Sequence, residues 1–170
     1  MLYLMCLKEE LRNNIMGSYA QKDLNTVLES ELLGQRLFAT AAAFSLSSDK
    51  RRKWQTLEVL ETQTKQRLLD YLQHSQQKAR ARRHIPLEAA ISGIALALLP
   101  WKLSMHLVEQ GTQSFLNTFE RLQAQSQQHP QDTDFFDFVV AHEKAIQQFA
   151  RREKAGEKHH TLAAVHALLR

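Results

Sequence analysis

The fold is decided by residues 21–46, QKDLNTVLESELLGQRLFATAAAFSL. Apolar side chains recur in this stretch at spacings of three and four residues, which is the pattern of one face of an α-helix. One acidic residue, Glu31, interrupts that apolar face. A carboxylate that faces a core costs several kcal/mol unless it is protonated, paired or bound to a cation. Glu31 therefore indicates both a buried helix face and a candidate site.

The same pattern recurs in three further stretches, at about residues 49–77, 101–127 and 132–156. Each predicted helix carries a single glutamate on its apolar face, namely Glu61, Glu109 and Glu143 in chain order. Glutamates from four helices can converge only inside a bundle, which is the arrangement that a di-metal carboxylate site requires. The short Ser47-Ser48-Asp49 turn forces the first two helices into an antiparallel hairpin, with Ser48 or Asp49 as a helix cap.

The connection between the second and third long helices is much longer. A basic stretch, residues 78–85, is followed by Pro86, which is well placed in the first turn of a helix at about 87–98. Pro100 then predicts a kink or a short break before the third long helix. A last short helix is expected at about residues 160–169. The sequence thus predicts an all-α four-helix bundle with one long crossover and a short C-terminal helix.

The composition is that of one ordinary helical domain of 170 residues, with few glycines and prolines. We expect a single domain over residues 17–170 and an N-terminal extension of uncertain order over residues 1–16, with Met16 as a plausible alternative start. The single cysteine, Cys6, is consistent with a reducing cytoplasm. The apolar run 91–101 is about half of the roughly 20 residues that a membrane span needs, so we expect no membrane partner.

The segment HEKAIQQFARRE, residues 142–153, resembles the last helix of rubrerythrin-type proteins. Together with the helix order, the long crossover and the four glutamates, it makes residues 20–156 similar to the ferritin-like superfamily. That resemblance implies di-iron or di-manganese chemistry, with two lone glutamates and two Glu-x-x-His pairs as ligands. The chain departs from this pattern at both histidine positions, where Thr64 follows Glu61 and Ile146 follows Glu143.

His142 precedes Glu143 and could replace a missing imidazole ligand, or it could lie at a boundary between helices. The candidate metal ligands are accordingly Glu31, Glu61, Glu109, Glu143 and His142. Two other interpretations of the glutamates remain open. Each could sit at the edge of its stripe and pair with Lys or Arg, or the group could form a remnant polar centre that shares protons or bonds to Gln35, Arg36 or Thr64.

Three functional hypotheses follow from these residues. The preferred one is a binding protein with a remnant carboxylate centre and no cofactor, which recognises a small ligand or a partner without catalysis. The second is a di-metal oxidoreductase that uses iron or manganese. The third is a helical adaptor that binds nucleic acid through residues 78–84, since the chain has a net charge of +4; we rank this partner last. A homodimer is also expected.

Overall fold

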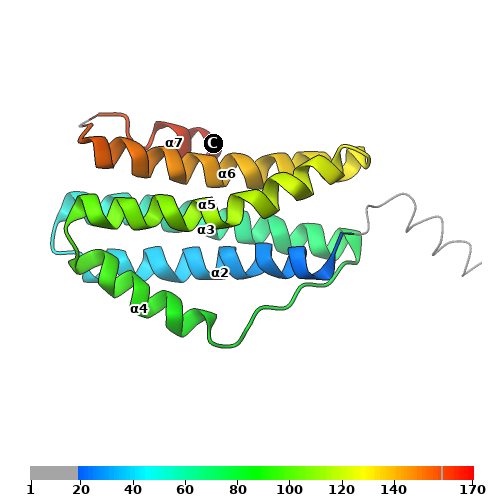
Figure 1. The fold of residues 1–170 in the computed structure, drawn as a ribbon, viewed down its shortest axis with the longest axis horizontal. Coiled ribbons are helices and arrows are strands. Elements are labelled where there is room, and N and C mark those ends of the chain that lie inside the picture. The colour runs from blue at the N-terminus through cyan, green and yellow to red at the C-terminus, as the bar shows by residue number, and fades with distance from the viewer. Residues whose placement is uncertain (1–18, 158) are drawn as a thin grey trace, which may run out of the picture.

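The protein is an all-α molecule, as the sequence predicted (Figure 1). The structure is a computed structural model that describes residues 19–157 and 159–170; the predicted N-terminal extension and Cys6 lie outside these residues. Six helices are present in the described part of the chain: α2 (Gln21–Phe44), α3 (Ser48–Ser75), α4 (Ile85–Leu98), α5 (Trp101–Ser126), α6 (Pro130–Ala155) and α7 (Ala163–Leu168).

The long helices pack as two hairpins, α2 with α3 and α5 with α6. The first hairpin turns at Ser47, whose side chain accepts a hydrogen bond from the Lys50 backbone N–H at 3.4 Å. Ser47 is therefore the helix cap, whereas the sequence predicted Ser48 or Asp49. In the second hairpin α6 begins at Pro130, and Asp132 lies in its first turn, where it accepts a hydrogen bond from the Tyr19 hydroxyl at 3.0 Å.

A crossover, residues 76–100, joins the two hairpins and contains α4. Pro86 lies in the first turn of α4, and Pro100 precedes α5 as its N-cap residue, so the predicted break at Pro100 is confirmed. Helix α4 packs against α2, and a Cβ atom at Gly93 would overlap the backbone carbonyl oxygen of Leu37. Only glycine allows this close approach. Helix α7 lies against α6, on the side of the molecule opposite to α4 (Figure 1).

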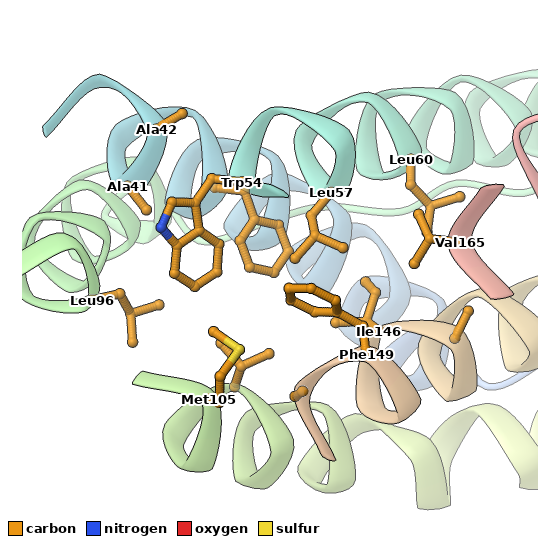
Figure 2. Packing of buried hydrophobic residues seen from close by; sticks show 14 residues of the cluster. Ala41, Ala42, Trp54, Leu57, Leu60, Leu96, Met105, Ile146, Phe149 and Val165 are labelled. Carbon is orange, nitrogen blue, oxygen red and sulfur yellow. The ribbon is translucent and has the colours of Figure 1, made fainter. Parts of the chain in front are cut away.

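The core consists of two hydrophobic clusters, one towards each end of the long helices. The first surrounds Trp54, which stacks on Phe38 with ring centroids 5.6 Å apart, and it includes Phe149 and Met105 (Figure 2). The second surrounds Phe119 and Phe136. None of the helices in the described residues is long and apolar enough to cross a membrane.

A polar layer separates the two clusters. On α2, α3 and α6 the core glutamate falls between a residue of one cluster and a residue of the other. Glu31 lies between Val27 of the second cluster and Phe38 of the first. Glu61 lies between Leu68 of the second cluster and Leu60 of the first, and Glu143 lies between Val140 of the second and Ile146 of the first.

Candidate functional site

Three predicted site residues meet in the middle of the bundle. Glu31 on α2, Glu61 on α3 and His142 on α6 are all buried, and each offers one ligand atom within 4.8 Å of the others. The His142 Nε2 atom lies 3.5 Å from Oε2 of Glu61, and its Nδ1 atom lies 3.8 Å from Oε2 of Glu143. We call these four residues the central cluster. It combines three carboxyl groups with one imidazole.

His142 and Glu143 are adjacent in the sequence, yet both are buried. Neighbouring positions on a helix point about 100° apart, so a single packing face does not bury both. Helix α6, however, packs against α3, α5 and α7, which together cover most of its circumference. This covering places His142 inside the bundle, beside Glu143.

Burial controls the protonation of the carboxyl groups. Loss of hydration raises the pKa of Glu31 and of Glu61 to about 8, because the charged forms are disfavoured in the interior. The pKa of Glu143 is also raised well above its usual value, first by burial. A hydrogen bond joins the carboxyl groups of Glu31 and Glu61. Near neutral pH the central cluster therefore holds protons that a bound cation could displace.

Several polar atoms of the central cluster have no hydrogen-bond partner within the described part of the chain. They are Oε2 of Glu31 and both ring nitrogens of His142. Buried polar groups in native proteins are normally hydrogen-bonded, and those that are not need an explanation such as a bound ion, water or ligand. These unpartnered atoms make the central cluster a candidate binding site.

Glu109 does not join the central cluster. Its carboxylate pairs with the Arg151 side chain at 2.8 Å and with Lys154, near the surface between α5 and α6. These two cations lower the pKa of Glu109 through their hydrogen bonds. Glu109 therefore sits at the edge of its helix face and pairs with basic side chains, which is one of the interpretations that the sequence left open. Glu31, Glu61 and Glu143 face the interior.

The two positions that would hold histidines in a di-metal site hold no ligand. The Thr64 hydroxyl donates a hydrogen bond to the Leu60 backbone carbonyl at 3.0 Å, and Ile146 belongs to the first hydrophobic cluster. With one imidazole and without Glu109, the donor set does not fit the pair of metals that the family resemblance implies. Glu31, Glu61 and His142 could hold one ion, because carboxylate oxygens and imidazole nitrogens are both ligands of divalent metals.

A cavity of about 330 Å³ adjoins the central cluster. Its walls come from α2, α4 and α5 and are mostly apolar, while Glu61 and Glu143 form its inner end. The lining includes both exposed and buried residues, so the cavity runs from the surface to the buried carboxyl groups. The exposed lining residues are Ser92, Ala95, Leu107 and Gly111.

This cavity was not predicted from the sequence, because α4 was expected only as part of the connection between the two hairpins. Two glycines within apolar helices were the available signal, since such glycines often mark close packing or a site. A Cβ atom at Gly34 would overlap the Glu61 carboxylate. Gly34 thus makes room for the carboxylate, and Gly93 allows α4 to approach and close the cavity.

Comparisons with protein-family models, with curated proteins and with solved structures found no match for this chain.

Proposed function

We propose that this chain is a ferritin-like bundle that binds a small apolar amine and does not carry out oxidative catalysis. The ferritin-like assignment is supported by the two hairpins, the long crossover over residues 76–100 and the three inner glutamates. The binding assignment is supported by one observation above all: an apolar cavity ends at the carboxyl groups of Glu61 and Glu143.

The cavity selects its ligand by size and by charge. Its volume of about 330 Å³ lies at the lower end of the range for small-molecule sites. At roughly 30 Å³ per water-sized group, it holds about ten non-hydrogen atoms. Side chains such as Leu33, Leu37 and Val108 supply an apolar wall. An ammonium group at the end of a short hydrocarbon chain would reach the carboxyl groups and supply the positive charge that they lack.

Binding of an ammonium group is coupled to proton release. At pH 6 the carboxyl groups with a pKa of about 8 are protonated, and the cation must displace protons to pair with them. At pH 8.5 they are largely ionised, and an amine with a pKa near that of lysine is still charged. The affinity should therefore rise between pH 6 and pH 8.5, and protons should be released on binding.

The test uses n-octylamine as the probe, with n-octanol and octanoate as comparators of the same length, in isothermal titration calorimetry. We expect octylamine to bind at least tenfold more tightly than octanol at pH 8, and octanoate not to bind. Glu61→Gln should weaken octylamine binding by about 10- to 100-fold, because a hydrogen bond to a charged group contributes roughly 1.5–3 kcal/mol. Glu109→Gln is the matched control. Equal affinities for octylamine and octanol would exclude a charge-selective site.

A second candidate function is the binding of one divalent transition-metal ion by Glu31, Glu61 and His142. The observation that favours it is the set of three ligand atoms within 4.8 Å, of which the imidazole nitrogens have no hydrogen-bond partner. Metal content should be measured by plasma mass spectrometry on protein purified without chelator and then reloaded with Mn(II) or Fe(II).

About one ion per chain, lost in His142→Ala, is the result expected of the single-ion site. About two ions per chain would instead support the di-metal oxidoreductase hypothesis. No ion before or after reloading would leave the amine as the ligand. Because metal and amine both require the Glu61 carboxylate, Mn(II) should also compete with octylamine if both bind.

A further inference from the structure

Five of the nine large apolar side chains that are exposed in the described residues lie on two helices, α4 and α5; the other four are Phe44, Leu46, Val59 and Leu69. Leu87, Ile91 and Leu98 on α4 are 66%, 61% and 68% exposed. They are four and seven residues apart, so they lie on one face of α4. The opposite face, with Ala89, Gly93 and Leu96, is buried. Helix α4 is therefore covered on one side and presents aliphatic side chains on the other.

Helix α5 extends this apolar surface. Leu103 and Leu107 are 43% and 41% exposed and lie one turn apart. Leu107 lines the cavity together with Ser92 and Ala95 of α4, which places this leucine beside that helix. We call the five exposed residues the α4–α5 patch: Leu87, Ile91, Leu98, Leu103 and Leu107.

Basic residues flank the α4–α5 patch. Arg80 and Arg83 are exposed in the connector that leads into α4, and Lys102 is exposed at the start of α5. Figure 1 places this connector and α4 along the same edge of the molecule. Two acidic residues lie nearby: Glu88 is exposed on α4, 3.5 Å from the His84 ring, and Glu109 is paired with Arg151 and Lys154. The surroundings of the patch are thus positive.

We propose that the α4–α5 patch attaches the protein to the surface of a membrane that contains anionic phospholipid. A helix that presents aliphatic residues beside cationic ones binds in the interfacial plane, because its apolar side chains enter the boundary of the acyl chains and its cations meet the lipid phosphates. This proposal goes beyond the sequence expectation of no membrane partner, which was based on the length needed for a span. Helix α4 has 14 residues and lies on the surface.

Charge complementarity favours a membrane over nucleic acid or a second copy of the chain. Nucleic acid would be held by cations and polar side chains, and it offers no apolar environment for Leu87, Ile91 and Leu98. Arg82, the central arginine of the basic connector, is already paired with Glu29 at 3.0 Å. A second copy would bring an equally basic surface against this one.

The experiment is flotation of the full chain with vesicles of phosphatidylcholine alone or with about one-third phosphatidylglycerol. Binding is expected to the anionic vesicles, at least tenfold weaker binding to the neutral ones, and weakening with salt. Arg80→Gln with Arg83→Gln should weaken binding by about 25-fold, at roughly fivefold for each cation. Leu87→Gln with Ile91→Gln and Leu98→Gln should abolish it. These residues are exposed, so the circular-dichroism melt should be unchanged.

The matched control is Val59→Gln with Leu69→Gln, which removes two exposed apolar side chains from α3; it should bind vesicles like the wild type. Three outcomes would overturn the proposal. One is failure to bind anionic vesicles. Another is a dimer in sedimentation velocity that the α4 triple variant converts to monomer, since the patch would then be an interface between two copies. The third is binding of a DNA or RNA oligonucleotide that the arginine double variant abolishes while vesicles do not bind.

Discussion

Two buried carboxylate sites in this bundle have opposite surroundings. Glu153 on α6, in the end of the bundle near Trp54, receives a hydrogen bond from the Trp101 indole N–H at 2.7 Å and a salt bridge from Lys53 at 2.8 Å. Glu31 and Glu61, in the middle, have each other, His142 and a weak contact from Ser30. Both sites are nearly inaccessible to solvent.

The difference separates a structural carboxylate from a functional one. A buried charge is tolerated when it has a counter-ion and hydrogen-bond donors, as Glu153 has in Lys53 and Trp101. Both hydrogen bonds go to the Oε2 atom of Glu153, and its Oε1 atom makes only the ion pair with Lys53. A cluster of acids with raised pKa values and unpartnered atoms destabilises the empty protein, and such clusters are typical of binding and catalytic sites. Substitutions at the two sites, and at the residues that shape or border the central cluster, should therefore affect stability and binding differently.

The largest effect on stability is expected from Glu153→Ala. Removing this carboxylate leaves the Trp101 indole N–H without its partner and leaves the Lys53 ammonium group with Asp49 alone, at 2.9 Å. Breaking a buried pair from one side costs about 3–5 kcal/mol, and the remaining Asp49 contact places this loss at the lower end of that range. The measurement is the free energy of unfolding from urea denaturation. Glu157→Ala, which removes an exposed partner of Arg152 at 3.8 Å, is the control and should change stability by less than about 1 kcal/mol. If Glu153→Ala and Glu157→Ala lost equal stability, the contacts of Glu153 with Lys53 and Trp101 would contribute no more than an exposed ion pair.

Removing carboxyl groups from the central cluster should instead raise the stability of the folded state at high pH. Glu31 and Glu61 have pKa values raised from 4.5 to about 8, so the folded state keeps protons that the unfolded state releases. Their contribution to stability is therefore complete below about pH 4.5 and is lost as the pH rises through 8. Glu31→Leu with Glu61→Leu should remove this dependence and raise stability at pH 9 by about 1–4 kcal/mol.

Urea denaturation between pH 5 and pH 9 checks this prediction, with Glu109→Gln as the control. The same leucine double variant should no longer bind octylamine or metal. A double variant that is less stable than the wild type at pH 9 would contradict the distinction between the two sites, because the carboxyl groups would then be structural.

Alanine substitutions at two buried glycines, Gly93 and Gly34, should change stability less than Glu153→Ala. At Gly93 a methyl group meets the Leu37 backbone carbonyl, which cannot move unless α4 leaves α2, so Gly93→Ala should destabilise by about 1–3 kcal/mol. At Gly34 the methyl group meets only the end of the Glu61 side chain. Gly34→Ala gains about 1 kcal/mol in helix propensity, which offsets the crowding, so its stability should change little.

Although Gly34→Ala should change stability little, it should weaken ligand binding. Displacement of the Glu61 carboxylate should weaken octylamine binding by at least tenfold, measured by calorimetry at pH 8. Gly111→Ala is the control for the added methyl group, because nothing lies within 4 Å of the new Cβ atom. If Gly34→Ala left binding unchanged while Gly111→Ala weakened it, the ligand would lie at the outer end of the cavity.

Periodicity alone predicted most of the helical architecture. The stripes that contain Glu31, Glu61 and Glu143 follow strong helical spacing, and Pro86 and Pro100 marked the start of α4 and the break after it. The site was harder to predict, because the side chains that meet depend on how helices pack. Helical spacing placed Glu109 and Glu143 equally inward, yet Arg151 and Lys154 on the facing helix hold Glu109 at the surface. The burial of His142 likewise depends on three neighbouring helices.

The smallest effect is expected from Glu109→Gln, and it tests whether this glutamate belongs to the border rather than to the centre. Its partners Arg151 and Lys154 are partly exposed, so the lost ion pairs should cost at most about 1 kcal/mol and less in high salt. Urea denaturation at low and high salt measures this loss of stability. Octylamine calorimetry and metal content should both match the wild type, because Glu109 lies outside the central cluster. A loss of bound metal in Glu109→Gln would instead place this carboxylate among the ligands, as in a di-metal site.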